Sequence, residues 1–276
     1  MRGVLLNEVA RFVSAPRRWL PIILAALFIG LVNTDQIRAI AFNQQVSVNL
    51  WDAILVSMNN WIDLSFVLLM AIAFSVSDIV TSDYLTNYHW LVLTRSRSRF
   101  KWWAAKLAVV FLVVLVAIVA TLSSTLIWGL VQGIPFSSMP SSFAMGDFDG
   151  PPYFPVLAPD THMPILVISM ALLAALGLGA KVSCVVFLSL FLAKPFALIG
   201  LVFSWALLDY TLAGWVSFWQ RYLSPTMKMM LMTHWPREDR FLPHLMPPLW
   251  TSVVFFVVII SAVCFFGWRW VRSADF

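Results

Sequence analysis

Long apolar runs are the feature that most constrains the fold of this chain. Hydrophobic residues make up 61% of its 276 residues, and charged residues only 11%. That much apolar surface cannot be hidden in one soluble core, so the chain is expected to lie in a lipid bilayer. A helix needs about 20 apolar residues to cross the hydrocarbon layer. Six runs approach or exceed that length: 19–32, 64–80, 104–130, 164–193, 196–213 and 249–268. The sequence therefore predicts an all-α membrane protein with six transmembrane helices in a single domain, residues 1–276.

Basic residues predict the orientation of these helices, because short cytoplasmic segments of membrane proteins hold an excess of Lys and Arg. They gather before the first run, between the second and third, after the fourth and after the sixth: Arg2, Arg11, Arg17, Arg18, Arg95, Arg97, Arg99, Lys101, Lys106, Lys194, Arg269 and Arg272. Segment 33–63 holds one Arg, and segment 132–163 holds no Lys or Arg. Both termini are therefore predicted to be cytoplasmic, and segments 132–163 and 209–248 extracytoplasmic. Segment 209–248 departs from the charge rule, although its acidic residues partly offset its basic ones.

Residues 1–18 are predicted to form an amphipathic helix on the cytoplasmic membrane surface, ended by Pro16. Apolar residues share one face and polar residues lie off it: Leu5, Val9, Phe12 and Val13 against Asn7, Glu8 and Arg11. The alternative is an ordinary frayed start to the first span. That first run is short, and Asn33, Thr34 and part of 37–40 would have to extend it across the bilayer. In segment 132–163, repeated prolines forbid a regular helix.

Composition and motifs argue against several classes of function. Cytoplasmic loops and anionic lipid account for the net charge of +5, so no nucleic-acid partner is expected. The four histidines form no HExxH motif and the carboxylates are scattered, so no catalytic or metal site is predicted. Residues 177–183, GLGAKVS, lack the spacing of a phosphate-binding loop. Cys184 and Cys264 fall in predicted spans, where small buried side chains are expected. The chain is therefore predicted to be no enzyme and to hold no cofactor itself.

Lys181 and Asp209 are the ionisable residues most suited to a role inside the membrane. Lys181 lies in the fourth run, where a lysine is costly and is expected to face a protein interior or water. Alternatively, it reaches the cytoplasmic interface from the end of a shorter span.

Residues 227–232, MKMMLM, form a methionine-rich segment with two possible roles. Their thioethers either hold a soft ion such as Cu(I) or pack irregular apolar surface, and the sequence favours packing.

The connection 83–106, between the second and third runs, is the most basic stretch of the chain. Its first part carries an apolar stripe at helical spacing, formed by Leu85, Tyr88, His89 and Val92. The pattern predicts a short amphipathic cytoplasmic helix that offers an apolar ridge, with a rim of arginines, to a soluble partner. In the alternative, the basic residues only anchor the chain to anionic headgroups, and Trp90, Trp102 and Trp103 lie in the interfacial belt.

This connection resembles the signature cytoplasmic loop of type-2 ABC exporter permeases, the membrane subunits that work with a separate ATPase. The residues that carry the resemblance are Asp83, the pair Val92 and Leu93, Ser98, Arg99 and Lys106. Asn87 stands where the family has Gly, and Ser96 where it has Pro. Residues 188–195 (LSLFLAKP) and 222–225 (YLSP) are similar to the family's turns after its fourth and fifth spans, and 272–276 (RSADF) to its charged tail.

The resemblance implies a membrane-spanning exporter subunit in the cytoplasmic (inner) membrane of a prokaryote. Its expected partners are a cytosolic ABC ATPase, which binds ATP and Mg²⁺, and a second permease subunit, either identical or homologous. The ATPase would dock on the connection through Asp83, Leu85, Tyr88, His89, Val92, Leu93, Arg95, Arg97 and Arg99. The alternative is an ATP-independent secondary transporter, which needs intramembrane ionisable residues such as Lys181 and Asp209.

Overall fold

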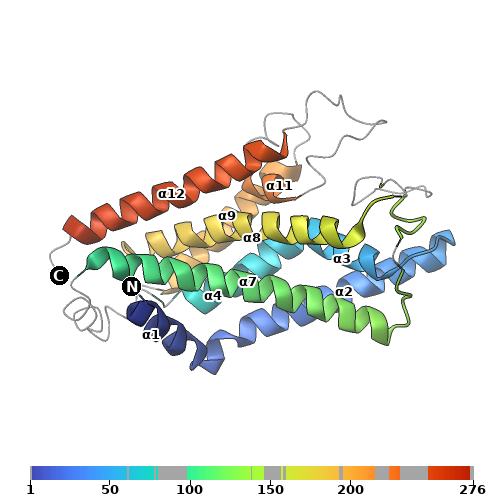
Figure 1. Cartoon of the computed structure of the whole chain (residues 1–276), viewed down its shortest axis with the longest axis horizontal. Helices are drawn as coiled ribbons and strands as arrows, with labels where there is room; N and C mark the ends of the chain where they lie inside the picture. Colours follow the sequence, from blue (N-terminus) through green and yellow to red (C-terminus); the bar gives the residue numbers. More distant parts are fainter. Residues whose placement is uncertain are drawn as a thin grey trace.

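The structure is a computed structural model, and it describes residues 2–60, 62–77, 79, 98–137, 139–145, 157, 160–192, 195–214, 224–230 and 248–273. Within these residues the regular structure is entirely helical, and the long helices lie side by side in one elongated bundle (Figure 1). The elements, in chain order, are α1 (Arg2–Val13), the 3₁₀ turn η1 (Pro16–Arg18), α2 (Leu20–Gln44), α3 (Leu50–Asn59), the π-helix η2 (Asp63–Leu68), α4 (Leu69–Val76), α7 (Arg99–Val131), α8 (Met163–Leu188), α9 (Pro195–Gly214), α11 (Pro225–Met229) and α12 (Leu249–Ser273). The predicted all-helical fold is confirmed.

Four helical stretches of the described chain are long and apolar enough to cross a membrane: Pro16–Gln44, Arg99–Val131, Met163–Leu188 and Leu249–Ser273. A fifth span results if Leu50–Asn59 and Asp63–Val76 are one broken span, with an angle of 63° between the two parts. The predicted run 196–213 is α9, whose described apolar stretch, Ala197–Asp209, is shorter than a full span. The chain is thus a multi-pass membrane protein by the length and composition of its helices.

The first span is longer than its uninterrupted apolar run, because α2 continues through two polar residues. Asn33 donates through Nδ2 to the carbonyl of Ile29 at 2.9 Å, and Thr34 donates through Oγ1 to the carbonyl of Gly30 at 2.7 Å. These bonds use one Asn33 donor and the Thr34 hydroxyl proton within the helix, and both residues lie fully buried near the midpoint of α2. The helix ends at Gln45, whose φ of 54° is left-handed.

A further helix, α3, occupies part of the segment 33–63, whose sequence shows neither a clear strand pattern nor a clear helix pattern. Asn49 begins it with a capping box: the Asn49 side chain accepts from the backbone N–H of Asp52, and Asp52 accepts from the backbone N–H of Asn49 at 2.6 Å. The proline-rich segment then covers this helix start, since Leu50 N–H bonds to Pro135 at 3.0 Å and the Trp51 indole to Ser137 at 2.7 Å. The described residues between α7 and α8 form no helix, as their prolines predicted.

The two ends of the described chain lie at the same end of the bundle (Figure 1). Arg99, at the start of α7, donates through Nη1 to the carbonyls of Val271 at 3.1 Å and Arg272 at 2.8 Å, in the last turn of α12. A cation at a helix C-terminus is stabilised by the free carbonyls and the helix dipole. Farther along α7, Lys106 contacts Glu8 of α1. The start of α7 therefore joins both ends of the chain.

The N-terminal helix exists as predicted, but its buried face differs from the predicted one. Phe12 is buried, as expected for an apolar-face residue, whereas Val13 is 52% exposed. Glu8 was predicted to lie off that face, yet only 4% of it is exposed. The reason is a charge partner, because Lys106 of α7 lies directly against Glu8. Polar patterning alone placed Glu8 on the wrong side of α1.

Trp102 and Trp103 are interior residues, which contradicts the alternative that placed them in an interfacial belt. Each is 1% exposed within α7. Gly267 of α12 makes room for Trp103: a Cβ at this glycine would lie 2.4 Å from the indole ring. The two tryptophans therefore pack the contact between α7 and its neighbours and do not anchor the chain at headgroups.

Candidate functional site

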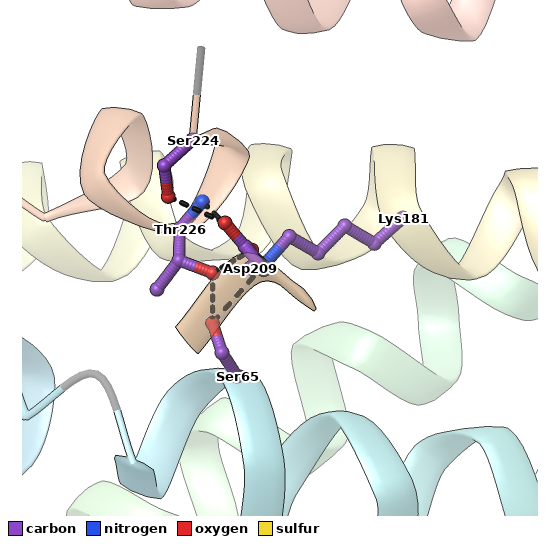
Figure 2. A network of polar contacts seen from close by, with 5 residues as sticks. All are labelled: Ser65, Lys181, Asp209, Ser224 and Thr226. Carbon is purple, nitrogen blue, oxygen red and sulfur yellow. Dashed lines mark hydrogen bonds and ion pairs between the residues drawn. The ribbon is translucent and has the colours of Figure 1, made fainter. Parts of the chain in front are cut away.

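An ion pair buried between α8 and α9 is the centre of the candidate site (Figure 2). Nζ of Lys181 lies 2.8 Å from Oδ2 of Asp209, and each side chain is 2% exposed. Lys181 stands seven residues before the end of α8, which corresponds to about 10 Å along the helix axis. Its side chain lies in the protein interior, which is the first of the two placements that the sequence left open. The structure thus brings together the two ionisable residues that the sequence singled out separately.

Two hydroxyl groups complete the surroundings of the Lys181 ammonium. It donates to Oγ of Ser65 at 3.1 Å and to Oγ1 of Thr226 at 2.5 Å, in addition to Asp209. Ser65 belongs to the π-helix η2, and Thr226 to the short helix α11. An ammonium group has three protons to donate, so these three acceptors match its full capacity.

The Asp209 carboxylate is equally well surrounded. Ser224 donates its hydroxyl to Oδ1, while Thr226 donates both its hydroxyl and, at 3.2 Å, its backbone N–H to Oδ2. Because Thr226 gives its hydroxyl proton to Asp209, the 2.5 Å contact between Ser65 and Thr226 requires Ser65 to be the donor. A directed chain of hydrogen bonds therefore runs from Ser65 through Thr226 to Asp209 (Figure 2).

This cluster, which we call the Lys181–Asp209 network, joins four separate segments of the chain. Removing two charges from water is costly, and close pairing with further hydrogen bonds offsets that cost. The network is therefore weak as a source of net stability but strongly dependent on geometry. If α8 and α9 moved apart by a few ångströms, both charges would need new partners or water.

Close packing holds α11 against α8 one helical turn from Lys181. A Cβ at Gly177 would lie 2.6 Å from the Cβ of Met229, so only glycine allows this approach. Met229 and Met230 are 1% and 0% exposed, consistent with the packing role that the sequence favoured for the Met-rich segment.

Among the described residues, no group of three or more His, Cys, Asp and Glu is arranged to hold a metal ion. Cys184 and Cys264 are half-buried free thiols.

A second buried ion pair joins α1 to α7. Nζ of Lys106, 1% exposed, lies 2.6 Å from Oε2 of Glu8 and 3.0 Å from the carbonyl of Ile79. The other Glu8 oxygen, Oε1, is buried and accepts no hydrogen bond from the described residues. Beside it is a cavity of about 10 Å³, lined also by Arg11 and Arg18, which is about the room that one water molecule needs.

Of the predicted ATPase-docking residues, Arg99 alone lies within the part of the chain that the structure describes. Asp83, Leu85, Tyr88, His89, Val92, Leu93, Arg95 and Arg97 lie outside the described residues. Of the residues that follow, Ser98 caps α7, with its side chain accepting from Lys101 N–H at 3.4 Å, and Arg99 binds the end of α12. Ser98, Arg99 and Lys106 therefore all lie at or near the start of α7, where the connection 83–106 begins to form this helix.

Sequence reasoning missed the uncharged partners of the network and the role of Glu8. Ser65, Ser224 and Thr226 are common residue types next to or within apolar stretches, and no spacing links them to Lys181. One local signal was present: Ser224 precedes Pro225 at the start of α11, where a hydroxyl residue often lies at a helix N-terminus. For Glu8, an acidic residue within an otherwise basic N-terminal helix was the available signal.

A family model described as "Protein of unknown function (DUF2705)" matches residues 22–276. The chain belongs to the DUF2705 family. The DUF2705 match includes the whole Lys181–Asp209 network and Lys106, whereas Glu8 precedes it. Comparison with curated proteins and with solved structures finds no match.

Proposed function

We propose that this DUF2705 protein is the membrane-spanning subunit of an ABC exporter, driven by ATP that a separate cytosolic ATPase hydrolyses. The observation that supports this function best is the set of contacts around the connection 80–97. Before it, the Ile79 carbonyl binds Lys106; after it, Ser98 and Arg99 begin α7 and bind the end of α12. A force applied to the connection would therefore act on α1, α7 and α12 together.

In the proposed topology, six segments cross the membrane: α2, the broken pair α3 and α4, α7, α8, α9 and α12. An even number of crossings agrees with the position of both chain ends at one end of the bundle (Figure 1). The excess of basic residues at that end favours a cytoplasmic location for it. The segment 132–163 between α7 and α8, which we call the cap, would then face the outside.

The proposed mechanism depends on linkage between the ATPase and the bundle. ATP binding can favour one conformation of the bundle only if the partner contacts the connection differently in the two conformations. The apolar ridge of 85–92 would supply most of the binding energy, and Arg95 and Arg97 would orient the partner. ATP and Mg²⁺ belong to the ATPase, and a second permease subunit, identical or homologous, completes the exporter.

An ATP-independent secondary transporter is the second candidate, and the Lys181–Asp209 network favours it. Buried ionisable residues inside a membrane bundle commonly mark ion or substrate pathways. An ion-coupled transporter would separate and re-form such a pair during its cycle. The two candidates differ in their dependence on an ATPase, so an ATPase-binding experiment separates them.

The test is copurification of a co-expressed ABC ATPase with the tagged chain. Changing Tyr88→Asp together with Val92→Asp places two charges on the ridge and is expected to abolish retention of the ATPase at normal membrane abundance. Tyr88→Phe with Val92→Ile is the matched control, which keeps the ridge apolar and should retain the partner. Retention of the ATPase by the charged variant at wild-type yield would rule out this docking element.

A further inference from the structure

The α3–α4 stretch is interrupted beside the midpoint of α2. α3 ends at Asn59, Asn60 is extended, and the helix resumes at Asp63 after a bend of 63°. A helix end leaves carbonyl oxygens without intrahelical partners, and the helix dipole adds partial negative charge there. Such breaks occur at membrane depth only where they face a protein interior or a water-filled cavity. At this interruption α3 ends, and Asp63 lies in the first turn of the next helical segment, η2.

Asp63 is buried at this break without a positive charge to balance it. Its side chain is 3% exposed, and its Oδ2 accepts a 2.6 Å hydrogen bond from Nδ2 of Asn33. No basic side chain in the described part of the chain forms an ion pair with it. An ionised carboxylate in the interior of a membrane bundle is strongly unfavourable unless a cation accompanies it.

The carboxamide of Asn33 supplies a second oxygen that lacks a partner. Asn33 is fully buried and donates through Nδ2 to both Asp63 and the carbonyl of Ile29. Its Oδ1 accepts no hydrogen bond from the described residues. Oδ1 is bonded to the same carbon as Nδ2, the atom that contacts the Asp63 carboxyl. The buried oxygen-bearing groups of Asp63 and Asn33 are thus joined by one N–H donor.

We propose that Asp63 and Asn33 bind one small monovalent cation, a proton or Na⁺, at the break between α3 and η2. The groups present are a carboxylate and an amide oxygen beside a helix break, and broken helices coordinate H⁺ or Na⁺ in membrane transporters. A divalent ion is a poorer fit, because a single carboxylate balances only one positive charge. No group of three or more His, Cys, Asp and Glu occurs among the described residues to add to it.

The other charged groups around η2 already have partners. Lys181 and Asp209 approach η2 from α8 and α9 as an ion pair. α4, with the sequence LMAIAFSV, has no titratable residue, and α2 contributes the amide of Asn33. Asp52 lies at the opposite end of α3 from the break and accepts from the Asn49 backbone. Among the described residues around η2, Asp63 is the carboxylate whose charge a bound cation would neutralise.

The cation site and the Lys181–Asp209 network share the helix η2. Asp63 begins this six-residue π-helix, and Ser65 of the network follows two residues later. A π-helical turn is a strained variant that is found mostly at functional positions. Binding or release of the cation at Asp63 would therefore shift the hydroxyl that Lys181 contacts. This site goes beyond the proposed exporter function, which requires no bound cation.

Infrared spectroscopy and thermal unfolding of the purified chain in lipid nanodiscs test the site. Asp63→Asn removes the charge and keeps the shape of the side chain. Asp35→Asn is the matched control, because Asp35 lies on α2 two residues from Asn33 but is exposed and accepts from Gln132. A bound proton predicts a carboxylic-acid carbonyl band, lost at high pH, in the wild type and in Asp35→Asn but not in Asp63→Asn. Bound Na⁺ predicts that Na⁺, exchanged for choline at constant ionic strength, raises the melting temperature of the same two proteins but not of Asp63→Asn.

A second variant, Asn33→Leu, keeps the carboxylate and removes its amide partner, so it should change the apparent cation affinity by about 10-fold or more. This variant and the wild-type titration decide the question even if Asp63→Asn does not fold. The proposal is overturned if the wild type shows neither the acid band nor a response to Na⁺, or if Asp63→Asn keeps whichever signal the wild type shows. Because the chain is measured without any ATPase, a negative result leaves the exporter proposal unaffected.

Discussion

Lys181 illustrates how a single charged residue becomes acceptable inside an apolar bundle. Its ammonium has three acceptors, and its counter-ion Asp209 receives donors on both oxygens. Lys181→Met leaves a buried carboxylate without a counter-charge, so it should lower the free energy of unfolding by about 3–5 kcal/mol. Lys181→Met combined with Asp209→Leu should recover most of this loss, because no unpaired charge remains. Thermal unfolding in detergent, followed by tryptophan fluorescence, measures both effects.

The control for this double-mutant cycle is Lys101→Met, at a half-buried position on α7 with no ion pair to another described residue. It should change stability by less than about 0.5 kcal/mol. Losses from Lys181→Met and Asp209→Leu that simply add in the double variant would show that the two charges do not interact in the membrane.

At this scale the sequence identified the charges but not their arrangement. Lys181 and Asp209 are conspicuous because charged residues are rare in apolar runs, whereas their pairing depends on the rotation of α8 and α9 about their own axes. Asp63 was counted only among the scattered carboxylates, since it stands at the edge of an apolar run. Its burial follows from the continuation of α2 through Asn33, which apolar run length alone does not predict.

Helix contacts in this bundle depend on glycines that admit a neighbouring backbone. At Gly30 of α2, a Cβ would lie 2.8 Å from the backbone carbon of Ser124 and 2.9 Å from the backbone nitrogen of Thr125, both on α7. Gly30→Ala should therefore destabilise the fold by about 1–3 kcal/mol, because the helices must separate. Gly200→Ala on α9 should instead stabilise it by about 0.5–1 kcal/mol, because no described atom beyond the adjoining residues and backbone of α9 lies within 4 Å of the new Cβ. Melting temperatures that shift in the same direction for both variants would contradict this close contact.

The attachment of α1 is a second test at the scale of elements. Glu8→Gln removes the charge that Lys106 contacts at 2.6 Å, so α1 should separate from α7 more often. Hydrogen exchange of the α1 amides is expected to become faster, while exchange in α8 stays unchanged. Exchanging the two charges, Glu8→Lys with Lys106→Glu, should restore part of the protection. Unchanged exchange in Glu8→Gln would indicate that apolar contacts such as Phe12 hold α1 without the ion pair.

Element boundaries were predictable where a local signal marks them. α1 ends at Val13, three residues before Pro16, which begins the 3₁₀ turn η1, and the prolines after α7 coincide with the absence of helix in the described part of that segment. α3 was not predicted, although Asn49 and Asp52 form a capping-box pattern, because its ten residues are too few for a span. The break at Asn60 also has a local signal, because the Asn60 side chain accepts from the backbone N–H of Ile62 at 3.0 Å, which is typical of Asn in turns and at helix starts.

At the scale of the whole molecule, the described residues include two buried ion pairs at different levels of the bundle. The Glu8–Lys106 pair joins the N-terminal helix α1 to α7, and the Lys181–Asp209 network joins η2, α8, α9 and α11. Apolar run length was sufficient to predict a multi-pass helical protein, because the bilayer thickness sets the length of each span. The number of crossings depends on whether the broken pair and the shorter α9 each cross the bilayer, which composition does not determine.

Cysteine labelling in intact cells tests the topology of the complete chain. In a background with Cys184→Ala and Cys264→Ala, single cysteines replace Gly3, Phe136 or Ser273, all exposed positions. Gly3 and Ser273 lie at the end of the bundle where α1 and α12 meet α7, and Phe136 lies in the cap after α7. A membrane-impermeant maleimide should label position 136 in intact cells, and positions 3 and 273 only after permeabilisation, because basic residues favour the cytoplasmic side. Labelling of positions 3 and 273 from opposite sides would exclude an even number of crossings, and labelling of both from outside would reverse the proposed orientation.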